Sequence, residues 1–162
     1  MRRHTASVLM TMPLLAVGPA AADEPSVPQY ASGASVFQAN CAVCHRANGA
    51  GNPGLAPPLT GYPAAYAKTE QGRRQLVLTV LYGMYGDVVV DDRHYNFKMP
   101  AFPQFDDATL ASVLNFVVFD VGHASPASVS LTAADIAAER SLALGGDAVR
   151  RHRVEVIEAI RQ

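Results

Sequence analysis

Apolar residues recur at helical spacing near the start of the chain. Gly33, Phe37 and Cys41 lie four residues apart, on one face of a predicted short helix. Ser32 directly precedes this pattern and is expected to be its N-cap. Glycine destabilises a helix interior by about 1 kcal/mol relative to alanine. Gly33 therefore indicates either a close crossing by another helix or a frayed helix end.

Two longer helices are predicted in the middle of the chain. Residues 69–82 place apolar side chains on one face, and the glycine-bearing segment 83–86 ends this helix. Residues 107–119 repeat the pattern, with Asp106 or Asp107 as the expected N-cap. The two apolar stripes consist of Leu76, Val77, Val80 and Leu81, and of Leu110, Val113, Leu114 and Val117 with Phe116 beside them.

A short β-hairpin is predicted between these two helices. Residues 87–90 are rich in valine, Asp91 and Asp92 form a turn, and residues 93–96 supply the second strand. The chain is therefore expected to be mostly α-helical, with this hairpin as a small insert.

The last part of the chain, residues 122–162, reads as a helical extension after a linker of small residues. Thr132 and Asp135 match a capping box, which opens a helix through about Leu144. Asp147 is expected to cap a final helix that ends near Ile160. That helix carries an apolar stripe with arginines on the opposite face. The stripe is Val149, Val156, Ile157 and Ile160, and the arginines are Arg150, Arg151 and Arg153.

The first 22 residues have the pattern of a signal peptide. Arg2, Arg3 and His4 form a basic start, Ser7 to Val17 is a short apolar run, and three alanines end at Ala22. Cleavage after Ala22 predicts a periplasmic protein, whereas an uncleaved amphipathic anchor is the alternative interpretation. Residues 23–31, with two prolines, form a loose lead-in.

The composition limits the kinds of molecule that the protein is expected to bind. Removing 22 of the 162 residues leaves 140, which is the size of one domain. Without Arg2 and Arg3, the 13 basic residues fall to 11 against 14 acidic ones, so the net charge is −3. Such a chain has no basic surface for nucleic acid. Only Lys68 and Lys98 are lysines, so docking to a partner protein is expected to be weakly salt-sensitive.

The segment Cys41-Ala42-Val43-Cys44-His45 has the spacing of a covalent haem attachment site. In one helical turn the two thiols and the imidazole lie on one face. Each thiol can form a thioether with a haem vinyl group, and the histidine can bind the iron as the proximal ligand. A redox disulfide is not favoured, because no βαβ pattern precedes Cys41. A zinc site is not favoured either, because the chain has only 2 cysteines and cannot complete the ligand set.

The motif Gly33-x-x-x-Phe37-x-x-x-Cys41-x-x-Cys44-His45 resembles the first helix of class I c-type cytochromes. In that family the final helix crosses the first at a glycine and an aromatic residue, and residues 107–119 are the candidate here. The segment 56–61 is similar to the family's Gly-Pro-x-Leu-x-Gly motif. The resemblance implies that the Pro57 carbonyl accepts a hydrogen bond from His45 Nδ1. It also implies that the side chains of Leu55 and Leu59 line the haem pocket. Ala56 and the second proline depart from the motif.

The segment Met99-Pro-Ala-Phe102 resembles the family's loop that carries the sixth iron ligand. The resemblance implies that Met99 is the distal ligand and that Phe102 lies close to it. From its position alone, Met99 would be interpreted as a methionine that packs in the hydrophobic core. Met84 and His94 are the alternative ligands, and His94 would give a lower reduction potential. Tyr95 is a candidate for contact with the haem propionates, although a surface turn explains it equally well.

The resemblance covers residues 32–121 and implies a cytochrome c fold with one covalent haem c. The pattern is similar to monohaem cytochromes that accompany periplasmic dehydrogenases, including quinoprotein ones. The implied function is one-electron transfer to a respiratory-chain acceptor, without an enzyme activity. The alternatives are a haem subunit bound permanently in an oxidoreductase complex, and a peroxidase-like or gas-binding protein with an open sixth site. The extension is expected to pack on the haem domain, to dock a partner, or to lie on a lipid surface.

Overall fold

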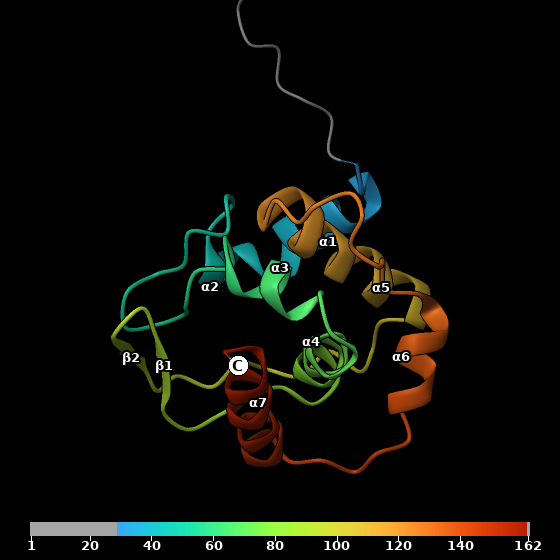
Figure 1. The fold of residues 1–162 in the computed structure, drawn as a ribbon. Coiled ribbons are helices and arrows are strands. Elements are labelled where there is room, and N and C mark those ends of the chain that lie inside the picture. The colour runs from blue at the N-terminus through green and yellow to red at the C-terminus, as the bar shows by residue number, and fades with distance from the viewer. Residues whose placement is uncertain (1–28, 162) are drawn as a thin grey trace, which may run out of the picture.

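The computed structural model describes residues 29–161, so the predicted signal peptide and most of the lead-in lie outside the described residues. The fold is mostly helical, with one two-stranded sheet among the described residues. Figure 1 shows α1 and α5 side by side, with α4 and α7 together below them and the hairpin at one side. The elements in chain order are α1 (Ala31–Asn40), α2 (Ala42–His45), α3 (Tyr62–Tyr66), α4 (Glu70–Tyr82), β1 (Val88–Val90), β2 (Arg93–Tyr95), α5 (Asp107–Asn115), the π-helix η1 (Phe116–Val121), α6 (Ala133–Glu139) and α7 (Gly146–Ile160).

Helix α1 crosses α5 at Gly33, as the family resemblance implies. A Cβ atom at this position would lie 2.1 Å from the backbone oxygen of Ser112, so no larger residue fits. Beside the crossing, the rings of Phe37 and Phe116 pack with centroids 5.3 Å apart. The close crossing, rather than a frayed helix end, therefore explains Gly33.

The predicted N-cap of α1 is wrong. The helix begins at Ala31, Tyr30 holds the cap position, and Ser32 instead pairs its hydroxyl with that of Ser112 at 2.7 Å. Asp120 fixes the entry to the helix, since its carboxylate accepts hydrogen bonds from the backbone amides of Gln29 and Tyr30 at 2.8 and 3.2 Å. A distant carboxylate thus holds the residues just before the helix, and no side chain of the described residues caps the first turn.

Helix α4 is confirmed with its predicted bounds. The Thr69 hydroxyl accepts a hydrogen bond from the Gly72 amide at 3.0 Å, and Gly83 ends the helix with a φ of 69°. The hairpin is also confirmed, with Val88 opposite Tyr95 and Val90 opposite Arg93. Its turn suits aspartate, because Asp91 and Asp92 both adopt positive φ, at 50° and 58°.

The last helix of the resembled fold is only partly as predicted. Asp106 caps α5, since its carboxylate accepts from the Thr109 amide at 2.7 Å. The α-helix ends at Asn115 and continues as a π-helix to Val121. Asn115 is buried, and its side chain exchanges two hydrogen bonds with the Leu131 backbone, at 2.8 and 2.9 Å. The wider turn therefore follows the point at which the extension is tied to α5.

The C-terminal extension packs on the rest of the chain as core. The capping box of α6 is present, but α6 ends at Glu139, five residues earlier than predicted. Arg140 leaves the helix to bind Asp107 Oδ1 at 2.7 Å and the Phe105 carbonyl at 2.8 Å. Ile136 of α6 is fully buried and joins the main cluster, which includes Leu76, Leu81, Leu114 and Val156.

Helix α7 corrects two predictions. Gly145 occupies the N-cap and Asp147 lies in the first turn, so Asp147 is not the cap. Arg153 is buried together with Val149 and Val156, rather than lying on the solvent face. Among the described residues, no helix combines the length and the apolar character needed to cross a bilayer.

Candidate functional site

The two cysteines and His45 lie in one helical turn, and all three line a single pocket. The turn is closed by hydrogen bonds from the Cys44 and His45 amides to the Cys41 carbonyl, at 3.1 and 2.9 Å. Both thiols are free. Burial, together with the nearby Cys44, raises the pKa of Cys41 to about 11. Redox-active Cys-x-x-Cys pairs have a lowered pKa instead, so this geometry does not favour a thiol–disulfide exchange site.

His45 is held in one orientation by the loop that follows it. Its Nδ1 lies 2.9 Å from the Pro57 carbonyl oxygen. Because a carbonyl can only accept a hydrogen bond, Nδ1 must donate and Nε2 keeps its lone pair. Burial lowers the pKa of the imidazole, and the hydrogen bond to Pro57 opposes this shift only partly. A neutral imidazole with a free Nε2 is the form that binds iron.

The glycine-rich loop after His45 has a structural reason. Gly51 adopts a φ of +73°, and a Cβ there would lie 2.6 Å from the Pro57 carbonyl carbon. The Gly51 amide also donates to the His45 carbonyl at 3.0 Å. The loop thus approaches its own return segment closely enough to bring the Pro57 carbonyl to the imidazole.

The pocket is lined by every residue that the sequence predicted to attach, ligate or contact the haem, apart from the alternative ligand His94. Besides the Cys41–His45 turn it is lined by Pro57 and Leu59 from the loop, Tyr95 from β2, and Met99 and Phe102 from the segment before α5. Leu55 lines it as well. Among the described residues, no aspartate or glutamate lines this pocket. Most of the remaining wall is apolar, contributed by α3, α4, α5 and η1, including Tyr66, Leu76, Val80, Val113, Leu114 and Val117.

Met99 and Met84 are directly opposite each other in a short antiparallel bridge. The Met84 amide donates to the Met99 carbonyl at 3.1 Å, and the Met99 amide donates to the Met84 carbonyl at 2.9 Å. Opposite residues in such a pair share a face, and both methionines line the pocket. Gly83 makes this approach possible, since a Cβ there would lie 2.5 Å from the Met99 carbonyl oxygen. Two thioethers therefore stand next to each other at one wall.

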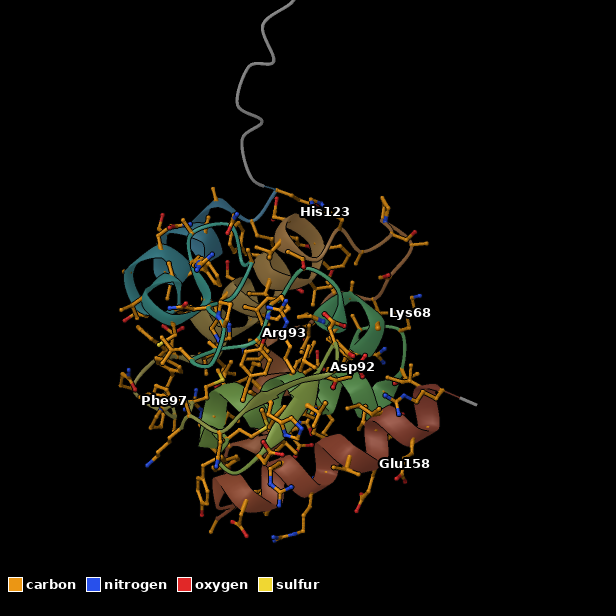
Figure 2. All side chains as sticks on the ribbon, turned by 90° about the vertical axis from the view of Figure 1, so that its left-hand side faces the viewer. Lys68, Asp92, Arg93, Phe97, His123 and Glu158 are labelled. Carbon is orange, nitrogen blue, oxygen red and sulfur yellow. The ribbon has the colours of Figure 1, made fainter. Side chains whose placement is uncertain are left out.

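His94, the other alternative ligand, lies outside the pocket. Its side chain is 72% exposed, and its Nδ1 lies 2.8 Å from Asp87 Oδ2. It sits on β2 near the hairpin turn, where Figure 2 labels Asp92 and Arg93. This geometry does not bring His94 into the pocket that His45 lines. His123, which is also labelled, is exposed as well.

Sequence reasoning missed several polar residues that line the pocket. Gln75 and Thr79 come from α4, Tyr62 and Tyr66 from α3, and Arg153 from α7. Arg153 was assigned to the solvent face, although it lies four residues after Val149 and three before Val156. That spacing places all three on one helix face. The spacing therefore indicated a buried position for Arg153, but its charge led to the prediction that it lies on the solvent face.

The residues present fit a covalently attached haem. The pocket has two free thiols on one helical turn and an imidazole whose Nε2 is unprotonated. It also has thioethers in its lining and a mostly apolar surface. No group of three or more His, Cys, Asp or Glu side chains suited to a metal ion occurs in the described part of the chain, which argues against the zinc alternative.

Comparisons with known proteins agree with this chemistry. A family model described as cytochrome c matches residues 30–118. The chain is 43% identical over 94 residues to cytochrome c-552 of Thermus thermophilus, covering 58% of this chain and 71% of that relative. A second cytochrome c-552, from a particular strain of the same species, is also 43% identical over 94 residues, which is 63% of its length. Helices α6 and α7 lie beyond the end of the family match.

Proposed function

The chain belongs to the cytochrome c family, and we propose that it is an exported carrier of single electrons between a periplasmic dehydrogenase and a respiratory-chain acceptor. Membership of this family means that the protein is an electron carrier with a covalently attached haem c. The observation that carries the residue assignment is the pocket itself. Cys41, Cys44 and His45 share it with the paired thioethers of Met84 and Met99.

The proposed roles follow from the donor atoms. Cys41 and Cys44 hold the cofactor through thioethers, His45 Nε2 is the proximal ligand, and Met99 is the distal ligand. The bound haem supplies a one-electron couple between Fe(III) and Fe(II). A neutral, soft thioether favours the reduced state relative to a second imidazole. Pro100 restricts the backbone next to Met99 and so helps to keep a weak ligand in position.

The remaining residues position the ligands and exclude water. The Pro57 carbonyl fixes the tautomer and ring orientation of His45 through the 2.9 Å hydrogen bond. Leu59, Phe102 and the apolar faces of α4 and α5 keep the surroundings dry, which limits the reorganisation that accompanies a change of charge. Tyr95, with 6% of its surface exposed, closes the pocket from the hairpin side.

The surface beside the pocket suits a transient, weakly charged contact. Val43 and Phe97 both line the pocket and are 79% and 62% exposed. Figure 2 shows Phe97 at the edge of the molecule. Small interfaces of this kind are typical of redox encounters. A dehydrogenase as donor, including a quinoprotein one, rests on the sequence resemblance.

The proposed domain organisation has four parts. Residues 1–22 are a signal peptide that directs the chain to the periplasm, and residues 23–31 form the lead-in. Residues 32–121 form the cytochrome c domain, and residues 122–162 form the extension. Support for the boundary between the last two is that the family match ends at residue 118. Mass spectrometry of the protein exported from its cell tests the signal peptide, because cleavage predicts an N-terminus at Asp23.

Carbon monoxide binding tests the carrier function against an open sixth site. The haem-loaded full-length protein is reduced at neutral pH and exposed to carbon monoxide. A carrier with a firmly bound methionine leaves the visible spectrum unchanged. Conversion to a carbon monoxide adduct at neutral pH would contradict the carrier function and favour a gas-binding or peroxidase-like protein.

A further inference from the structure

Helix α7 brings a buried positive charge to the pocket. Arg153 lines the pocket, and only 7% of its surface is exposed. Its guanidinium carbon lies 5.8 Å from the centre of the Tyr62 ring. Its one hydrogen bond among the described residues is a long one, from Nη2 to the Val89 carbonyl at 3.4 Å. A guanidinium has five N–H donors, so most of the donors of this residue have no protein acceptor.

The surrounding protein supplies no negative charge for this guanidinium. The ion pairs of the described residues involve Arg74, His94, Arg140 and Arg151, and not Arg153. No aspartate or glutamate of residues 29–161 lines the pocket. A buried charge is costly unless it is paired. The position of Arg153 therefore calls for an anion that the polypeptide does not provide.

A second polar group in the pocket also lacks a partner. The hydroxyl of Tyr66 is buried, and it forms no hydrogen bond within the described part of the chain. Burial raises the pKa of Tyr66, and the positive charge of Arg153 acts in the opposite direction. The Tyr66 ring packs against the Tyr62 ring with centroids 6.2 Å apart, and the Arg153 guanidinium lies over that same Tyr62 ring. Among the described residues, the Tyr66 hydroxyl has no hydrogen-bond partner and the Arg153 guanidinium has no ion-pair partner. Together they offer two kinds of hydrogen-bond donor to a single acceptor.

We propose that Arg153 and Tyr66 together bind a carboxylate of the haem, so that α7 completes the cofactor site from outside the family-matched region. The inference rests on the proposed function, because it requires a haem in this pocket. Haem carries two propionate groups, which are its only anionic side groups. A carboxylate matches the planar fork of arginine and accepts a hydrogen bond from a tyrosine hydroxyl.

This assignment gives Arg153 an effect on the redox couple. A positive charge buried near the iron disfavours the oxidised state, which carries one more positive charge than the reduced state. Burial strengthens the effect, because the local dielectric constant is lower than that of water. Pairing with a carboxylate reduces this effect but also holds the propionate in place. Arg153 therefore acts as a positioning residue that raises the reduction potential.

The test compares the full-length, haem-loaded protein with its Arg153→Met variant. The expected result is a lower reduction potential. At a fixed ambient potential the ratio of oxidised to reduced protein rises about tenfold, which is 59 mV for one electron. Arg153→Lys keeps the charge and is expected to restore part of the shift. Tyr66→Phe is expected to shift the ratio in the same direction by a smaller factor, without changing the shape of the pocket wall.

Arg151→Met is the matched control. It removes one arginine charge from the same helix, but Arg151 is exposed and paired with Asp147 at 2.6 Å. We expect a change of less than about twofold in the same ratio, because exposed charges are screened by solvent. Infrared difference spectra between the two redox states add a readout that looser packing alone would not reproduce. The propionate carboxylate bands are expected to move in Arg153→Met and to stay in place in Arg151→Met.

Two failures are distinguishable. A wild-type chain that binds no covalent haem contradicts the proposed function. A wild-type chain that binds haem, with an unchanged potential and unchanged carboxylate bands in both Arg153→Met and Tyr66→Phe, contradicts the present inference alone. Equal shifts in Arg153→Met and Arg151→Met would also overturn it, because net charge and not a contact would then explain the effect.

Discussion

Residues 30–118, which match the family, and the C-terminal extension meet at one pocket but contribute to it differently. The matched region supplies both proposed iron ligands and both proposed attachment cysteines, and three of these four residues lie within the five residues from Cys41 to His45. The extension supplies one pocket residue, Arg153, which arrives through the packing of α7 against α3 and α4. Haem attachment and the proximal ligand are thus set by short-range spacing, whereas the proposed charge compensation depends on a distant helix. The extension belongs to the core, and the proposal above makes it part of the site as well.

The largest effect is expected from removing both thiols of the matched region. A protein with Cys41→Ala and Cys44→Ala cannot form the two thioethers, so it should lose covalent haem entirely. Peroxidase staining of a denaturing gel checks this, with Val43→Ala as the matched control. Val43 lies between the cysteines and is 79% exposed, so its removal should leave the stain intact. Full staining of the double variant would contradict the assignment of the matched region as the attachment site.

The next effect concerns the two adjacent methionines. Met99→Ala should abolish the near-infrared sulfur–iron charge-transfer band of the oxidised protein and lower its potential, because the soft axial ligand is lost. Met84→Leu keeps the volume and should leave the band unchanged, although Met84 pairs with Met99 through the backbone at 2.9 Å and 3.1 Å. The opposite pattern, with the band lost only in Met84→Leu, would assign the iron to Met84.

A third effect, on the free energy of unfolding, distinguishes an extension that is part of the hydrophobic core from one that is only loosely attached. Val156 of α7 is 2% exposed and joins the cluster of α4 and α5 residues. Val156→Ala should lower the free energy of unfolding by about 2 kcal/mol, from lost burial and the cavity left behind. Val154→Ala, two residues away and 43% exposed, should change it by about 0.5 kcal/mol or less. Denaturant titration that finds equal effects would contradict the packing of α7.

The smallest effect is a pH dependence carried by the extension. Burial and the nearby Arg74 lower the pKa of His152, whose Nδ1 lies 2.6 Å from Gln75 Oε1. The unfolded chain therefore binds the proton more readily than the folded one below the ordinary histidine pKa of 6.5. The free energy of unfolding should fall as the pH drops below about 6.5, and His152→Asn should reduce this loss. The exposed His123 provides the control, since His123→Asn should leave the pH profile unchanged. An identical profile in both variants would contradict the role of His152.

The residues that were predicted correctly depend on local spacing. Gly33, the Asp91-Asp92 turn and the Thr132–Asp135 capping box each carry a requirement that neighbouring residues reveal. The same holds for the pocket residues from Cys41 to Leu59, because a helical turn and a short loop bring them together. The fold class followed from the periodicity of three helices and the short valine-rich strand.

The errors arose where distant parts of the chain decide the local structure. Asp120 fixes the start of α1 in place of Ser32, and Arg140 ends α6 early by binding Asp107 and the backbone before α5. Gly145 rather than Asp147 caps α7, with its backbone carbonyl accepting from the Ala148 amide at 2.9 Å. Arg153 was placed on the solvent face because a lone arginine is rarely buried. The helix face that Arg153 shares with Val149 and Val156 indicated burial, but the charge of the residue was given more weight.

A redox titration of the haem-loaded protein, followed by its visible and near-infrared spectrum, tests ligation by His45 and Met99 most directly. We expect one haem per chain, a single one-electron transition, and a sulfur–iron charge-transfer band in the oxidised state that disappears on reduction. An oxidised spectrum without that band, in a protein whose haem is covalently attached, would contradict ligation by His45 and Met99.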